Sequence, residues 1–153
     1  MAIHSDRDAV RRRLTPQQVM ALVDEHFPQV HEGNGRLSLE FLAPMTVHVR
    51  MAHDPRAVRP GGTVSGPAMF KLADFSVYAI ILAELGEAAL QAVTTSMTIN
   101  FLRRPQPGDI VAQTRLIKLG RRLAVAEIEI YAHGDPEMVA HATSTYALPP
   151  PRA

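Results

Sequence analysis

One segment of this sequence predicts a long helix that is apolar on nearly every side. Ser65 fits its N-cap, Pro67 falls at an early helical position, and Gly86 follows the last helical residue, Leu85. Between these ends, apolar side chains cover most of the circumference, so other elements must enclose the helix. An enclosed helix of about five turns leaves few folds open to a chain of 153 residues.

The segments around this helix predict a sheet that wraps it. Residues 14–30 predict an amphipathic helix, with Thr15 as N-cap and Pro16 as the first helical residue. Residues 36–54 predict one bulged strand or two short ones, and the prolines and glycines of residues 54–62 predict a loop. Four further strands are expected within residues 92–102, 110–120, 121–132 and 138–148. Because short links favour antiparallel pairing, the fold class is α+β: an antiparallel sheet around one long central helix, with an extra N-terminal helix.

The first strand after the central helix has two different faces. Strict alternation gives one face Val93, Thr95, Met97, Ile99 and Phe101, and the other Thr94, Ser96, Thr98 and Asn100. The apolar face is expected to meet the helix. The threonine-rich face suits contact with the sheet of another subunit, although exposure to solvent explains it equally well.

The composition excludes several kinds of site. The absence of cysteine rules out disulfides, a thiolate nucleophile and cysteine-ligated metals. The seven histidines show no metal-ligand spacing, and a net charge of +1 gives no field to attract nucleic acid or a membrane surface. No apolar run is long enough to span a bilayer, and the N-terminus lacks the apolar core of a signal peptide. We expect a cytoplasmic protein with a flexible segment at 1–13, one domain over 14–148 and a disordered tail at 149–153.

One carboxylate interrupts the apolar helix. Asp74 lies about two turns inside it, where a charge is costly unless it is paired, hydrogen-bonded or protonated. Lys71 could form an ordinary helical ion pair with Asp74, and Tyr78 could donate a hydrogen bond to it. A carboxylate in such a place could instead serve as a general base toward water or as a nucleophile. The residues alone leave these alternatives open.

Four stretches carry a resemblance to a known family. In chain order they are VSGPAMFKLAD, AVTTSMTINFLRRP, KLGRRLAVAEIEIY and VAHATSTY, within a match over residues 35–148. Their order and spacing resemble the hotdog-fold acyl-CoA thioesterases of the PaaI-like branch. The resemblance implies a hotdog domain that hydrolyses an acyl-CoA to a free acid and coenzyme A. It also implies a homodimer or a dimer-of-dimers tetramer, with no cofactor apart from the coenzyme A of the substrate.

The resemblance gives roles to residues near the start of the central helix. Asp74 corresponds to the catalytic Asp or Glu of the family, which acts as a general base or as the nucleophile that forms an anhydride. Gly66 corresponds to the backbone amide that holds the oxyanion, a role that suits a glycine at a helix start. Ser65 stands where the family often has His and is expected mainly as the N-cap. Thr94 corresponds to a Ser/Thr position that lines the site from the neighbouring subunit.

Substrate contacts are expected from two groups of residues. The group near the catalytic positions contains Arg59, Pro67, Tyr78 and Thr95, of which Arg59 replaces a frequent Asn or Gln and Pro67 replaces a Gly. Guanidinium and ammonium groups at strand ends and turns are candidates for gripping the phosphates of coenzyme A. These residues are Arg103, Arg104, Lys118, Arg121 and Arg122.

Two other functions fit parts of the sequence. Ser65 and Arg59, in place of the commoner residues, favour a non-catalytic acyl-CoA-binding protein. A hotdog hydratase would need a histidine partner for Asp74, and no histidine lies close to it in sequence. The acyl group stays open, because the aromatic and methionine side chains of the central helix suit either a pocket wall or core packing.

Overall fold

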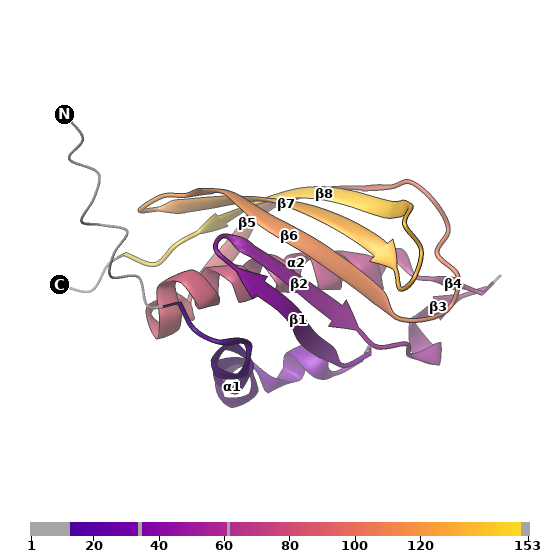
Figure 1. The fold of residues 1–153 in the computed structure, drawn as a ribbon, viewed down its shortest axis with the longest axis horizontal. Coiled ribbons are helices and arrows are strands. Elements are labelled where there is room, and N and C mark those ends of the chain that lie inside the picture. The colour runs from indigo at the N-terminus through magenta and orange to yellow at the C-terminus, as the bar shows by residue number, and fades with distance from the viewer. Residues whose placement is uncertain (1–12, 34, 61, 151–153) are drawn as a thin grey trace.

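The computed structural model describes residues 13–33, 35–60 and 62–150 (Figure 1). It contains two α-helices, a six-stranded sheet and a two-stranded ribbon in this part of the chain. The helices and strands are α1 Pro16–His26, β1 Leu37–Ala43, β2 Thr46–Met51, β3 Val58–Arg59, β4 Thr63–Val64, α2 Gly66–Leu85, β5 Val93–Phe101, β6 Ile110–Leu119, β7 Leu123–Ala132 and β8 Met138–Ala147. Three short 3-10 helices are η1 Pro28–His31, η2 Pro55–Ala57 and η3 Gly86–Ala89. Residues 1–12 of the expected flexible segment and 151–153 of the expected tail lie outside the described residues.

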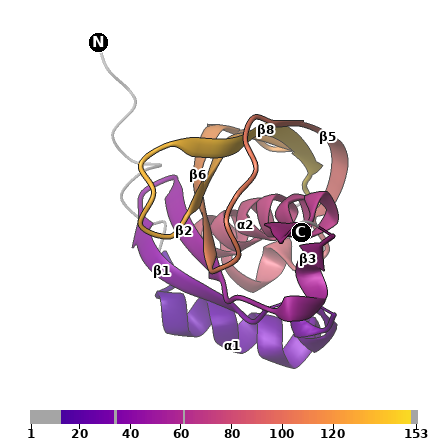
Figure 2. The same ribbon diagram turned by 90° about the vertical axis from the view of Figure 1, so that its right-hand side faces the viewer.

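The six strands follow the order β1-β2-β6-β7-β8-β5, and every neighbouring pair is antiparallel. Figure 2 shows the sheet curving around α2, with α1 on the side that the sheet leaves open. The hydrophobic core forms between these layers, and α2 lies at its centre. The predicted hotdog fold, with its extra N-terminal helix, is confirmed. No helix in the described part of the chain combines the length and the hydropathy needed to cross a membrane.

Both helices begin where the sequence predicts, and α2 also ends there, whereas α1 ends at His26 and the 3-10 helix η1 follows it. Ser65 Oγ accepts a hydrogen bond from Ala68 N at 3.2 Å, and Gly86 adopts a φ of 75° at the C-cap of α2. Fourteen of the 20 residues of α2 are buried, on all of its sides, which confirms an enclosed helix. Thr15 caps α1 through a reciprocal pair of hydrogen bonds with Gln18.

The region before α2 contains more structure than the sequence predicts. Residues 36–54 form two strands joined by a tight turn, in which Met45 has a φ of 60°. The buried carboxylate of Glu84 holds this turn, because Met45 N donates to Glu84 Oε1 at 2.7 Å and Arg13 Nε lies 3.2 Å from the same oxygen. The expected loop at 54–62 includes η2 and β3, and β3 pairs with β4.

The prediction of strict alternation along β5 is wrong at its start. The register with β8 shifts between Thr94 and Ser96, so Thr95 is the extra residue of a bulge. A one-residue shift moves side chains to the other face, and Thr94 therefore points to α2 together with Met97 and Ile99. The expected apolar contact with α2 is only partial, since Val93 and Phe101, at the two ends of β5, are more than half exposed.

Candidate functional site

Asp74 lies in the middle of α2 and directs its carboxylate toward the start of β5. Thr94 Oγ1 donates to Asp74 Oδ1 at 2.6 Å, and the Tyr146 hydroxyl donates to the same oxygen at 2.8 Å. Within the described residues, no hydrogen bond to Asp74 Oδ2 is found. Thr94 thus contacts the carboxylate of its own chain, and its approach to a site from a neighbouring subunit stays a prediction. The half-buried Asp74 presents one held oxygen and one open oxygen.

The two local partners proposed for Asp74 are engaged elsewhere. Lys71 Nζ donates to the backbone oxygen of Glu32 at 2.8 Å, and the Tyr78 hydroxyl donates to the backbone oxygen of Leu90 at 2.7 Å. Burial lowers the pKa of Lys71, and the nearby charge of Glu32 opposes that shift. An ordinary helical ion pair therefore does not account for Asp74.

Tyr146 is the site residue that the sequence analysis missed. It is 3% exposed, and its hydroxyl also donates to the backbone oxygen of Asp74 at 2.9 Å. Burial, followed by the charge of Asp74, raises the pKa of Tyr146 far above the ordinary value of a tyrosine, so the hydroxyl keeps its proton for donation. The stretch VAHATSTY belongs to the resemblance, but only the pairing of Thr94 with Tyr146 between β5 and β8 indicates this role.

Asp74 lies in the wall of a cavity of about 570 Å³. α2 contributes Phe75 and Tyr78 to this cavity. Phe27 comes from the connection between α1 and η1, Val30 from η1, and Leu90 from the segment before β5. Most of this lining is apolar. A carboxylate next to such a wall suits a ligand that joins an apolar group to a reactive carbonyl.

Gly66 opens onto a second cavity, of about 870 Å³. The ring of Phe101 covers the place of the missing side chain, because a Cβ on Gly66 would lie 3.3 Å from Phe101 Cζ. Lys71 lines this cavity and also the cavity of Asp74. In one chain, the two residues expected to act together are therefore in adjoining but different cavities.

The structure brings together only part of the predicted substrate-binding set. Arg59, Pro67, Arg103 and Arg104 line the Gly66 cavity. Lys118, near the end of β6, and Arg121 and Arg122, in the turn between β6 and β7, lie outside the lining of both cavities. Within a single chain, the predicted phosphate-binding residues thus form two groups.

The remaining predicted positions have clear structural roles. Ser65 Oγ caps α2, as expected. Thr95 Oγ1 donates to Thr145 O at 3.1 Å and lies outside both cavities. Tyr78 lines the Asp74 cavity with its ring. No group of three or more His, Cys, Asp or Glu side chains in the described ranges is placed to hold a metal ion.

A family comparison decides the class of protein. Residues 61–139 match the model described as the thioesterase superfamily. The chain belongs to this superfamily. A crystal structure of a thioesterase candidate from Silicibacter sp. TM1040 is 45% identical, the match covers 90% of this chain and 93% of that one, and the TM-score is 0.81. This result confirms the predicted hotdog thioesterase family. The reaction of this family is thioester hydrolysis.

More distant relatives agree with this superfamily. A structure from Ralstonia eutropha JMP134, described as a thioesterase candidate related to phenylacetic acid degradation, has a TM-score of 0.67 at 22% identity over 73% of this chain and 84% of that one. That likeness is one of fold. A curated esterase candidate from Saccharolobus solfataricus is 25% identical over 140 residues, which are 91% of this chain and 83% of that protein.

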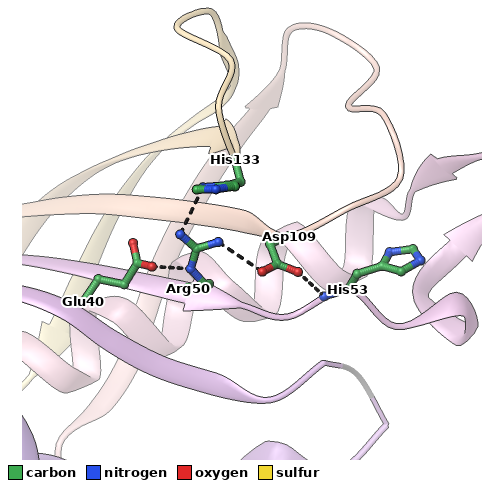
Figure 3. A network of polar contacts seen from close by, with 5 residues as sticks. All are labelled: Glu40, Arg50, His53, Asp109 and His133. Atoms are coloured by element: carbon green, nitrogen blue, oxygen red, sulfur yellow. Dashed lines mark hydrogen bonds and ion pairs between the residues drawn. The ribbon is translucent and has the colours of Figure 1, made fainter.

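A charged network lies at one edge of this thioesterase-superfamily domain (Figure 3). Asp109 Oδ1 accepts from His53 N at 2.7 Å, and Arg50 Nη1 donates to Asp109 Oδ2 at 3.0 Å. Arg50 also pairs with Glu40 and donates to His133 Nδ1 at 3.0 Å. The backbone hydrogen bond from His53, followed by the bond and charge of Arg50, lowers the pKa of Asp109.

The network holds the bases of the two loops that border the Gly66 cavity. One loop follows β2 and leads to Arg59, and the other joins β5 to β6 and carries Arg103 and Arg104. His53 lies at the start of the first loop and Asp109 at the end of the second, so their hydrogen bond ties the loops together. The sequence analysis missed this contact, because its partners lie 56 residues apart.

Proposed function

We propose that this chain hydrolyses acyl-CoA thioesters to a free acid and coenzyme A. One observation carries the proposal: Asp74 lies in the wall of an apolar cavity with one carboxylate oxygen held by two hydroxyl groups. The thioesterase superfamily supports the reaction class. We propose coenzyme A as the carrier of the thioester, and catalytic roles for Asp74 and the Gly66 amide.

Two routes use the same carboxylate. As general base, Asp74 accepts a proton from water while the water oxygen bonds to the thioester carbon. The Gly66 amide stabilises the resulting oxyanion, whose collapse breaks the C–S bond, and the proton passes to the departing thiolate. As nucleophile, Asp74 bonds to that carbon, the thiolate leaves, and water hydrolyses the anhydride. Both routes need Asp74 and Gly66 close to one carbonyl group.

Asp74 and Gly66 of one chain are too far apart to meet that need. They are eight residues apart on α2, which corresponds to about 12 Å along the helix axis. The carbon and oxygen of a carbonyl group are only about 1.2 Å apart. We therefore propose that Asp74 of one copy acts with Gly66 of a second copy, in a site shared across a dimer.

The free edge of β5 supports such a dimer. β5 pairs only with β8 among the described strands, so its other edge carries unpaired backbone groups. Gly66 lies against Phe101 at one end of β5, and Asp74 bonds to Thr94 at the other end. Antiparallel pairing of two β5 edges about Met97, the middle of the strand, would bring the Phe101 end of one copy opposite the Thr94 end of the other. Gly66 and Asp74 from different copies would then approach each other.

The same dimer would combine the two groups of basic residues. The register from β7 through β8 to β5 places the β6–β7 turn at the Val93 end of the sheet. The pairing proposed above puts this end beside Arg103 and Arg104 of the second copy. Guanidinium groups from both copies could then contact the phosphates of coenzyme A. A homodimer or a dimer-of-dimers tetramer in the cytoplasm completes the proposal.

The test is release of free thiol from a panel of acyl-CoAs by the purified protein. We expect the wild type to be active and Asp74→Asn to lose about 100-fold or more in kcat, the usual contribution of a positioned general base. The matched control is Glu87→Gln, which alters an exposed carboxylate outside both cavities and should leave kcat unchanged.

The alternatives predict different results. Tight binding of acyl-CoA without turnover by the wild type would identify a binding protein, and addition of water to an enoyl-CoA would identify a hydratase. Full activity in a folded Asp74→Asn variant would show that Asp74 has no role in the reaction. Circular dichroism and the oligomeric state of each variant show whether a loss of activity is a loss of structure.

A further inference from the structure

We propose that the Asp74 cavity holds a short apolar acyl group, and that Phe27 of the N-terminal segment limits the length of that group. The inference rests on the proposed function, since it takes Asp74 as the position of the thioester carbonyl. It goes further by giving the α1–η1 connection a part in substrate choice. Nothing in the reaction itself requires that segment.

The cavity has a short path from the carboxylate to the N-terminal segment. Tyr78 lies one helical turn beyond Asp74 on α2, about 6 Å along the axis. The ring of Phe27 meets the ring of Tyr78 edge to face, with the centroids 6.2 Å apart and the planes at 88°. Both rings line the Asp74 cavity. An acyl chain that starts at Asp74 and follows α2 therefore reaches this aromatic pair after a short distance.

Hydrogen bonds fix both members of the pair. The Tyr78 hydroxyl is held by the backbone oxygen of Leu90, as described above. Phe27 is the C-cap of α1, where its N–H donates to Val23 O at 2.7 Å, and Pro28 follows it at the start of η1. Phe27 is nevertheless 37% exposed, so the core does not enclose the thin wall that it forms.

Removal of this thin wall should lengthen the cavity outward. In Phe27→Ala, a longer acyl chain could pass the former ring position and cover Tyr78 and Val30, which line the same cavity. One methylene group in an apolar pocket changes discrimination by about tenfold or more. A larger ring, in Phe27→Trp, should oppose long chains more strongly than the natural residue does.

The experiment measures kcat/KM for a series of straight-chain acyl-CoAs of increasing length. We expect the ratio of the longest to the shortest accepted chain to rise about tenfold in Phe27→Ala, to rise less in Phe27→Leu and to fall in Phe27→Trp. The matched control is Phe41→Ala, which removes an aromatic ring of similar exposure from β1, where it packs on His48 away from both cavities.

A binding measurement separates this inference from the proposed function. The affinity for non-hydrolysable acyl-CoA thioethers of the same lengths is measured by calorimetry with wild type and variants. A wild type that binds but does not turn over acyl-CoA refutes the proposed function, while a shifted length profile in Phe27→Ala would still support the inference. If the folded Phe27→Ala and Phe27→Leu variants keep the chain-length profile of the wild type, as the Phe41→Ala control should, the inference is overturned.

Discussion

The hydroxyl of Tyr146 offers a sharp test of how Asp74 is held. Tyr146→Phe removes the donor to Asp74 Oδ1 and keeps the volume of the ring, which is almost fully buried. Thr94 still donates to the same oxygen at 2.6 Å. The backbone oxygen of Asp74 also loses the tyrosine, but its hydrogen bond within α2 remains. The change is therefore confined to the support of one carboxylate.

Its magnitude follows from the kind of bond removed. A hydrogen bond to a charged group contributes about 1.5–3 kcal/mol, and the lower limit applies here because Thr94 remains and Asp74 is half-buried. A loss of about 1.5 kcal/mol in transition-state stabilisation lowers kcat about tenfold. The free energy of unfolding should fall by about 1 kcal/mol, which corresponds to a decrease of about 2–4 °C in Tm for a chain of this size.

The assay is steady-state thioester hydrolysis together with thermal unfolding. Tyr131→Phe is the matched control, because the Tyr131 hydroxyl also donates to a carboxylate oxygen, Glu129 Oε2, at 2.9 Å. Glu129 lies outside both cavities, so the control should leave kcat unchanged. Equal kcat values for wild type, Tyr146→Phe and Tyr131→Phe would refute the view that Tyr146 orients the reacting carboxylate.

Two further contacts yield predictions of their own. Ser76→Ala should destabilise the protein by about 1–3 kcal/mol in chemical denaturation, because it leaves the buried Thr114 hydroxyl without the partner that lies 2.6 Å away. Adding Thr114→Val should recover part of that loss, and simple additivity of the two changes would contradict the reasoning. Asp109→Ala should raise KM for acyl-CoA several-fold with little effect on kcat, because it removes the acceptor for His53 N and the partner of Arg50, and so loosens the loops of the Gly66 cavity. A fall in kcat with constant KM would contradict a role confined to binding.

The central helix could be predicted from the sequence because its signals are local. The serine cap, the early proline and the glycine stop all lie within a few residues of the helix ends. The apolar residues around its whole circumference then require a covering sheet. The same reasoning gave α1 its N-cap at Thr15. Local chemistry and one buried helix were therefore enough for the fold class.

The surroundings of Asp74 could not be predicted in the same way. Lys71 and Tyr78 are its neighbours on the helix surface, but backbone oxygens from distant segments bind them. The true partner, Tyr146, is 72 residues away and reaches Asp74 only after β8 has paired with β5. Contacts between strands depend on register, and a one-residue shift changes which side chains face inward.

The bulge in β5 shows how register and chemistry are connected. If β5 alternated strictly along its length, Thr94 would point away from α2 whenever Met97 and Ile99 point toward it. The extra residue, Thr95, lets the core-packing side chains and the hydroxyl that holds Asp74 share one face. Because the bulge lies near one end of β5, the register with β8 from Ser96 to Phe101 stays regular. The support of Asp74 thus depends on this irregularity, because the extra residue places the Thr94 hydroxyl on the face that packs against α2.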